Sequence, residues 1–180
     1  MDISVIIPTY NQQARLSLVL CSLSCQSFKG DLEVLVVDDG CTDGTETVVE
    51  GYLASGALNV RLVHGIGRQG RNASRNRGLQ QATGRLTAFL DADALPGPEL
   101  LARYFEAFLA HDGPVLLSGM QYHLPELEHL SDPRTAAIDA DSDLPSVVRD
   151  FIATNGDRLT VTETMVSNRF EEIHERARRG

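Results

Sequence analysis

Two aspartates separated by one residue, Asp91 and Asp93, have the types and spacing that most directly suggest chemistry in this sequence. They follow the apolar run 86–90, which is typical of a buried strand. Side chains at alternate positions after a strand can direct two carboxylates at one ligand. Carboxylate oxygens suit Mg²⁺ or Mn²⁺, and Mg²⁺ often bridges protein carboxylates and the phosphates of a substrate. The pair therefore predicts a divalent-cation site; the alternative interpretation is a solvated loop that contains two caps.

A second acidic string, residues 38–45, begins with an Asp-Asp-Gly turn at the end of another apolar run. Its carboxylates could accept hydrogen bonds from a ribose or a base, although a tight turn requires the same residue types. Asp43 and Glu46 have the spacing of a capping box for the helix that follows. We therefore expect Asp43 to cap this helix and Asp39 to be the ligand residue.

Arginines are concentrated between the two acidic strings, at Arg68, Arg71, Arg75 and Arg77. Arginine binds phosphate through a planar fork of N–H donors. Four arginines near two carboxylate motifs indicate an anionic ligand in a site that also holds acids and a metal ion. An exposed helix face would account for at least two of the four without any ligand.

Residues 65–70 match the G-x-G-x-x-G pattern of dinucleotide-binding loops, and they lie between an apolar run and a helical pattern as such a loop should. Asp91 lies near the position where the ribose-binding acid of that fold would fall. The rival hypothesis is therefore an oxidoreductase that binds NAD(P). Two expected strands precede the pattern, however, whereas the fingerprint belongs to the first unit of such a domain. The rival also leaves Asp39 and Asp93 without a role.

Alternating strand and helix signals must position these motifs. Apolar runs typical of buried strands occur at residues 3–7, 32–37, 60–63, 86–90 and 115–117. Apolar residues at helical spacing lie between the runs, at 16–23, 48–53 and, after Pro98, at 101–108. Residues 71–82 are also predicted to be a helix, with Gly84 as its stop. The alternation predicts an α/β domain with a mostly parallel sheet, helices on both faces and ligands at the carboxyl ends of the strands.

Composition narrows the classes of partner. The 180 residues carry a net charge of −9, with 25 acidic against 16 basic residues, which argues against a nucleic-acid partner. No apolar run has the length of a membrane span. No basic region precedes the first apolar stretch, so we expect no secretion signal and a cytoplasmic location. Three cysteines do not make a disulfide framework and are expected to be free thiols.

Four strings of this sequence, taken in order, resemble the family 2 glycosyltransferases, which have the GT-A fold. They are residues 5–11, 36–45, 71–78 and 89–93, which read VIIPTYN, VVDDGCTDGT, RNASRNRG and FLDAD. The resemblance implies an enzyme that transfers a sugar, with inversion, from a UDP- or GDP-sugar to an acceptor hydroxyl. It also implies a divalent cation, Mn²⁺ or Mg²⁺.

The same resemblance implies the residues of a donor site. They would be Pro8, Thr9, Tyr10 and Asp39 for the nucleoside, Arg75 near the nucleotide, Asp91 facing the ribose and Asp93 on the metal ion. Cys41 stands where the family usually has serine.

The end of the chain departs from the family pattern. It contains neither a convincing E-D string, which would supply the catalytic base, nor a Q-x-x-R-W signature. The base is therefore not identified, and the acids that could serve are Asp141, Asp143, Glu163, Glu171 and Glu172. We expect residues 1–119 to form the nucleotide-sugar-binding core and residues 120–180 a shortened acceptor-side region of the same domain.

Two consequences follow from a shortened acceptor side. The chain should bind its donor better than it turns it over, and uncovered apolar surface after Gly119 should favour a homodimer. A GT-A module that binds nucleotides without transferring a sugar is the main alternative, and the NAD(P)-binding oxidoreductase is the second.

Overall fold

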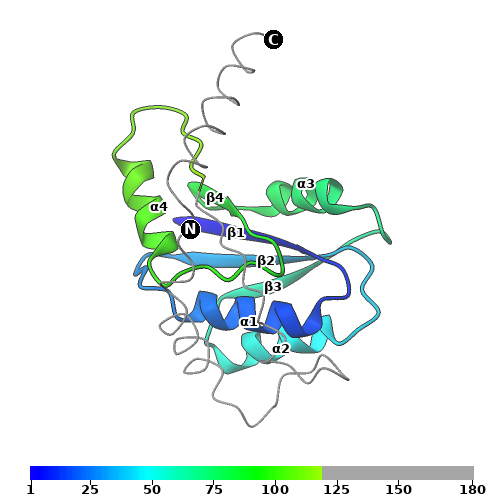
Figure 1. The fold of residues 1–180 in the computed structure, drawn as a ribbon. Coiled ribbons are helices and arrows are strands. Elements are labelled where there is room, and N and C mark those ends of the chain that lie inside the picture. The colour runs from blue at the N-terminus through cyan, green and yellow to red at the C-terminus, as the bar shows by residue number, and fades with distance from the viewer. Residues whose placement is uncertain (119–180) are drawn as a thin grey trace, which may run out of the picture.

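Four parallel strands form the sheet of this computed structural model, in which residues 1–118 are described. In chain order the strands are β1 (Ile3–Thr9), β2 (Leu32–Asp38), β3 (Val60–His64) and β4 (Leu86–Phe89). They lie side by side in the order β3-β2-β1-β4, and every pair is parallel. The helices α1 (Gln13–Ser24), α2 (Thr45–Ser55), α3 (Arg71–Gln81) and α4 (Leu100–Leu109) alternate with them (Figure 1). The predicted α/β fold with a parallel sheet is confirmed.

Different helices cover the two faces of the sheet. Figure 1 shows α3 on one side and α1 with α2 on the other. On β1, Ile3, Val5 and Ile7 belong to the core cluster that contains the α1 side chains, whereas Ile6 belongs to the smaller cluster on the other face. The helix α3 lies so close to β1 that a Cβ at Gly78 would collide with Ile6. A strand buried on both faces is a continuous apolar run, which is why these strands are predictable from sequence.

One predicted strand is wrong, and one predicted helix ends slightly early. Residues 115–117 form no strand, and the Leu116 side chain is 88% exposed. A run of three apolar residues becomes a strand only beside a neighbour that accepts its hydrogen bonds, and no strand within residues 1–118 pairs with it. The helix predicted over 71–82 is confirmed as α3; it ends one residue early, at Gln81, because Ala82 is already extended.

The predicted capping box at the start of α2 is also wrong. Asp43 accepts hydrogen bonds from the backbone N–H and the hydroxyl of Thr45, at 3.1 and 2.6 Å, instead of pairing with Glu46. Its other oxygen accepts the backbone N–H of Gln13 at 2.9 Å. Asp43 therefore joins the starts of α1 and α2, a tertiary contact that the local spacing does not reveal.

Some predictions concern residues that the structure does not describe, and others concern membrane spans and disulfides. The proposed acceptor-side region 120–180 and the five candidate bases lie outside the described residues. None of the helices within residues 1–118 has the length and apolar character that crossing a membrane requires. Cys21, Cys25 and Cys41 form no disulfide, in agreement with the predicted thiols.

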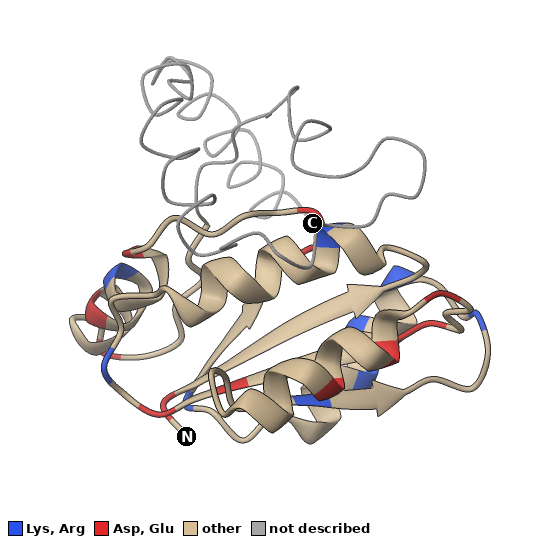
Figure 2. Ribbon diagram, turned by 90° about the horizontal axis from the view of Figure 1, so that it is seen from below, with Lys and Arg blue, Asp and Glu red and all other residues tan. Residues whose placement is uncertain are grey.

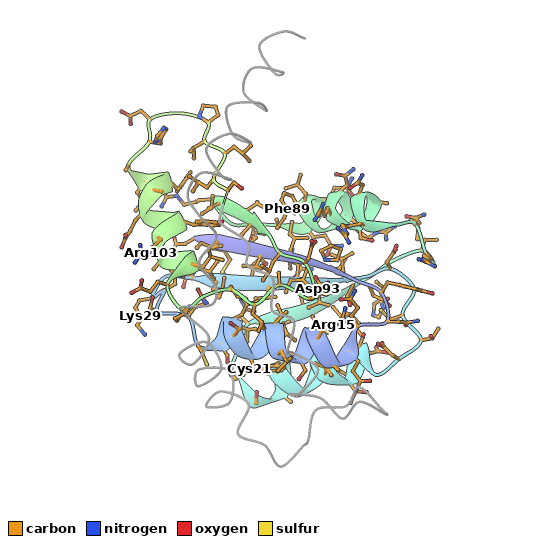
Figure 3. All side chains as sticks on the ribbon, viewed as in Figure 1. Arg15, Cys21, Lys29, Phe89, Asp93 and Arg103 are labelled. Carbon is orange, nitrogen blue, oxygen red and sulfur yellow. The ribbon has the colours of Figure 1, made fainter. Side chains whose placement is uncertain are left out.

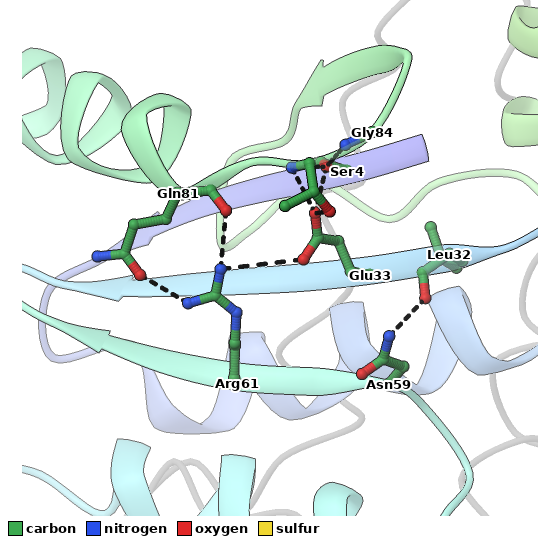
Figure 4. A network of polar contacts seen from close by, with 8 residues as sticks. Ser4, Leu32, Glu33, Asn59, Arg61, Gln81 and Gly84 are labelled. Carbon is green, nitrogen blue, oxygen red and sulfur yellow. Dashed lines mark hydrogen bonds and ion pairs between the residues drawn. The ribbon is translucent and has the colours of Figure 1, made fainter. Parts of the chain in front are cut away.

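A buried carboxylate ties β2 to the segment after α3 (Figure 4). Glu33 is 7% exposed, and its Oε1 accepts hydrogen bonds from the Ser4 hydroxyl at 2.6 Å and from the backbone N–H of Thr83 at 2.8 Å. Arg61 on β3 lies 3.9 Å from Oε2 and donates to Gln81 at the end of α3. Burial raises the pKa of Glu33, but the hydrogen bonds and the Arg61 charge lower it more, so the pKa lies below its ordinary value.

Replacing Glu33 by glutamine should lower the free energy of unfolding by about 1–3 kcal/mol, because buried hydrogen bonds to a charge are lost. A carboxyl whose pKa is lower in the folded than in the unfolded state stabilises the fold above the unfolded pKa. That contribution disappears as the pH falls through the folded pKa. The wild type should therefore lose more stability on acidification than Glu33→Gln, which urea unfolding at several pH values measures. Glu50→Gln, at an exposed position of α2, is the matched control; equal stability of the two variants would contradict the prediction.

Candidate functional site

Three of the predicted motifs meet at the carboxyl ends of β1, β2 and β4. Thr9 is the register partner of Asp38, and its carbonyl accepts the backbone N–H of Asp39 at 3.0 Å. Leu90, which follows β4, donates to the Ile6 carbonyl at 3.0 Å, so the chain enters the Asp91–Asp93 turn beside β1. Figure 2 shows acidic and basic segments near one another at the end of the sheet to which the strand arrows point. The structure thus brings together motifs that the sequence separates by tens of residues.

Asp39 is buried, with 5% of its surface exposed, and three protein groups donate to its carboxylate. It accepts hydrogen bonds from the backbone N–H of Gln69 at 2.8 Å, the backbone N–H of Gly70 at 2.9 Å and the Ser74 hydroxyl at 3.1 Å. Burial raises the pKa of Asp39, but these hydrogen bonds and the charge of Arg68 lower it more, so the carboxyl has a pKa below its ordinary value. Asp39 therefore holds the loop 65–70 and the start of α3. Ser74, which is completely buried, has no sequence signal that singles it out.

The glycine-rich loop 65–70 packs on the Asp-Asp-Gly turn. A Cβ at Gly40, whose φ is +90°, would lie 3.1 Å from the backbone nitrogen of Arg68, and a Cβ at Gly65 would collide with the Asp38 carbonyl. Gly70, with φ +91°, precedes α3 directly. In a dinucleotide-binding loop, the backbone amides at the start of the helix bind the pyrophosphate. Here the corresponding amides, before α3, already donate to Asp39. The loop geometry therefore gives no support to the NAD(P) hypothesis.

Asp91 is paired with two arginines from α3. Arg75 Nη2 donates to Asp91 Oδ1 at 2.8 Å, and Arg71 Nη1 lies 3.6 Å from Oδ2. The Nε of Arg75 is buried without a hydrogen-bond partner among the described residues. The α3 arginines therefore lie next to the Asp91–Asp93 motif, as predicted, and Arg75 retains an unused N–H donor beside it.

Asp93 is half exposed and faces α1 (Figure 3). Its Oδ2 lies 3.9 Å from Nη1 of Arg15, which the sequence interpretation did not include. The described residues hold no group of three or more His, Cys, Asp or Glu side chains that could enclose a metal ion. The donor set nevertheless fits Mg²⁺ or Mn²⁺, since such ions often use one or two carboxylates and take their other oxygens from substrate phosphates and water.

The end of β1 presents an aromatic face and a buried hydroxyl. Tyr10 is 37% exposed, and the Arg68 guanidinium carbon lies 4.1 Å from its ring centroid. Thr9 is 3% exposed, and its Oγ1 has no hydrogen-bond partner among the described residues. Pro8 is half-buried and pairs in register with Val37. These three residues therefore lie beside the Asp-Asp-Gly turn, as the predicted nucleoside site requires.

Cys41 joins the β1 and β2 loops. Its Sγ accepts the backbone N–H of Asn11 at 3.4 Å and lies 3.6 Å from the Thr9 carbonyl. Asn11, which has φ +49°, accepts the backbone N–H of Thr42 through its side chain at 2.8 Å. Burial raises the pKa of the Cys41 thiol, so the thiol is neutral at ordinary pH and acts as a small packing group.

A shallow cavity of about 360 Å³ lies at the other end of the sheet, near the amino ends of β1 and β2. It is lined by Met1, Phe28 and Leu58, among others, and by none of the predicted site residues. The strand ends described above therefore remain the candidate site.

Comparison with known proteins identifies a family. The model described as Glycosyl transferase family 2 matches residues 4–163. Glycosyltransferase AglE of Haloferax volcanii is 36% identical over 102 residues, which cover 56% of this chain and 33% of the relative. GalNAc(5)-diNAcBac-PP-undecaprenol beta-1,3-glucosyltransferase of Campylobacter jejuni is 38% identical over 91 residues, which cover 51% and 29%. The crystal structure of S. aureus TarS in complex with UDP-GlcNAc is 37% identical with a TM-score of 0.56, over 61% of this chain and 31% of that one.

This chain is much shorter than these relatives. It spans about a third of the length of the curated relatives that it matches. The range that the family model matches contains every predicted site residue, from Pro8 to Asp93.

Proposed function

Because the chain belongs to glycosyl transferase family 2, we propose that its strand ends bind a UDP- or GDP-sugar together with a divalent cation. The sugar is transferred to an acceptor hydroxyl with inversion at its anomeric carbon. The observation that carries the proposal is the convergence of Tyr10, Asp39, Asp91 and Asp93 at one edge of a parallel sheet. Ligands bind at this edge in open α/β sheets.

The nucleoside occupies the space beside β1 and the Asp-Asp-Gly turn. Tyr10 supplies an exposed aromatic face, and Asp39 supplies a carboxylate with a depressed pKa that stays ionised and accepts hydrogen bonds. The unpartnered hydroxyl of Thr9 lies at the same strand end. The 37% identity to TarS, which was solved with UDP-GlcNAc, supports a UDP-sugar donor.

The diphosphate lies between the Asp91–Asp93 motif and α3. Asp91 faces the ribose, and Asp93 is the carboxylate that holds Mg²⁺ or Mn²⁺. When bound, the cation neutralises part of the charge that develops on the leaving diphosphate. Arg71 and Arg75, which contact Asp91, supply further positive charge at the place where that negative charge develops.

A base must take the proton of the acceptor hydroxyl, and residues 1–118 give no candidate for it. A general base accelerates such a step by about 10²–10⁴-fold. A second candidate function is a nucleotide-binding module without transferase activity, which would follow if none of the acids Asp141, Asp143, Glu163, Glu171 and Glu172 serves as the base. The cytoplasmic location and the homodimer stay predictions from the sequence.

Binding of UDP or GDP should depend on a divalent cation, because Asp91 and Asp93 would otherwise repel the diphosphate. Calorimetric titration with Mn²⁺ and with EDTA measures this, and Asp93→Ala should remove most of the metal dependence. Asp112→Ala, which removes an exposed aspartate near the end of the described residues, is the control for the change in net charge. Equal affinity with Mn²⁺ and EDTA would refute the proposed metal site.

Asp39→Ala should weaken nucleotide binding by at least about tenfold, because a hydrogen bond to a buried charge is worth about 1.5–3 kcal/mol. The same change also releases the loop 65–70, so a second variant is needed. Ser74→Ala removes one donor to Asp39 but keeps the carboxylate, and it should weaken binding less. Equal losses in the two variants would show that Asp39 acts by positioning α3 and not by contacting the nucleoside.

Sugar transfer by the 180-residue chain should be slow or undetectable at donor concentrations that saturate binding. The measurement is release of UDP or GDP from sugar donors with a panel of hydroxyl acceptors, with Asp93→Ala as the background. Rapid transfer by a monomer would contradict the prediction, and one of the acids after residue 119 would then be the base.

A further inference from the structure

One arginine covers the aromatic face at the proposed nucleoside site. The guanidinium carbon of Arg68 lies 4.1 Å from the centroid of the Tyr10 ring. Two planar groups at this separation are in van der Waals contact, so no base fits between them. One face of the Tyr10 ring is therefore occupied by the protein's own side chain, and a nucleobase that stacks on this face must displace it.

The backbone holds Arg68 in this position from both sides. The next two residues, Gln69 and Gly70, donate their backbone N–H groups to the buried Asp39 carboxylate. On the other side, Gly40 lets the Asp-Asp-Gly turn approach, because its Cα lacks the Cβ that would stand 3.1 Å from the Arg68 nitrogen. The loop thus presents the guanidinium to Tyr10 from a well-anchored position.

Arg68 differs from the other arginines at this edge of the sheet. Arg71 and Arg75 pair with Asp91, and Arg15 pairs with Asp93. Within residues 1–118, no ion pair or side-chain hydrogen bond involves Arg68, and its charge acts on Asp39 by lowering that carboxyl's pKa. Its direct contact is the Tyr10 ring, an exposed cation–π pair that a ligand can displace.

We propose that Arg68 is an internal competitor for the nucleobase: it stacks on Tyr10 in the free protein and leaves the ring when a base binds there. The inference rests on the proposed function, in which Tyr10 and Asp39 hold the nucleoside. Arg68 thereby sets the affinity for the base, because the base gains only the difference between its own stacking and that of the guanidinium.

Neutral nucleosides test this, since they carry no phosphate that an arginine could attract. Uridine and guanosine are titrated by NMR into the wild type, Arg68→Ala and Arg103→Ala. The last variant removes the same charge from α4, where Arg103 pairs with Glu99. Arg68→Ala should bind the nucleosides about two- to fivefold more tightly, the effect of removing one exposed cation–π contact. Arg103→Ala should bind them as the wild type does, whereas unchanged or weaker binding by Arg68→Ala overturns the proposal.

The position of the arginine gives a second readout. Side-chain resonances of Arg68 should be shifted by the Tyr10 ring in the free protein, and the shift should disappear in Tyr10→Leu and at saturating nucleoside. A shift that persists at saturation overturns the proposal even if the affinities change. UDP with Mn²⁺ separates the two levels of inference. Failure of the wild type and Arg68→Ala to bind it overturns the proposed function and this inference together, whereas equal nucleoside affinities with intact UDP binding overturn this inference alone.

Discussion

The buried carboxylate of Asp39 is the interaction on which the described site depends. A buried charge is tolerated only when hydrogen bonds satisfy it, and here the donors come from the loop 65–70 and from α3. These bonds determine where α3 begins. Because Arg71 and Arg75 lie in its first two turns, their contacts with Asp91 follow from that starting point. One carboxylate directly after β2 thus organises the charges beside β4.

The same arrangement explains why residues 65–70 were compatible both with an NAD(P)-binding loop and with a glycosyltransferase. Glycines at positions 65, 67 and 70 suit a phosphate-binding loop, but they also suit a loop that packs at Gly65 on the Asp38 carbonyl and has positive φ at Gly67 and Gly70. The choice depends on which acceptor reaches the amides at the start of the helix. Here Asp39 reaches them from the turn that follows β2. Local sequence patterns cannot distinguish the two cases, because the acceptor lies thirty residues away in the chain.

What could be predicted from sequence follows from what is local. The four strands have apolar runs because both faces of the sheet are covered, and the acidic motifs lie at their carboxyl ends because parallel strands share one direction. The errors concern long-range partners: Asp43 bonds to Gln13 across elements, and within residues 1–118 no strand pairs with residues 115–117. Arg15 and Ser74 went unnoticed for the same reason, since each contributes through a contact made by the fold. Arg15 belongs to no motif, and Ser74 lies within the string 71–78 without a local signal for its bond to Asp39.

Carboxylates at the two ends of β2 accept hydrogen bonds from the two ends of α3. Asp39, just after the strand, holds the start of the helix, and Glu33, near the beginning of the strand, holds Thr83 just beyond its end. The eleven residues of α3 are therefore matched in length to the strand beneath them. An inserted residue would rotate everything after it by about 100° and advance it by about 1.5 Å. The hydrogen bonds at one end would then break, or the arginines would turn away from Asp91. Chains that share this arrangement should consequently tolerate amino-acid exchanges on the outer surface of α3 far better than insertions or deletions within it.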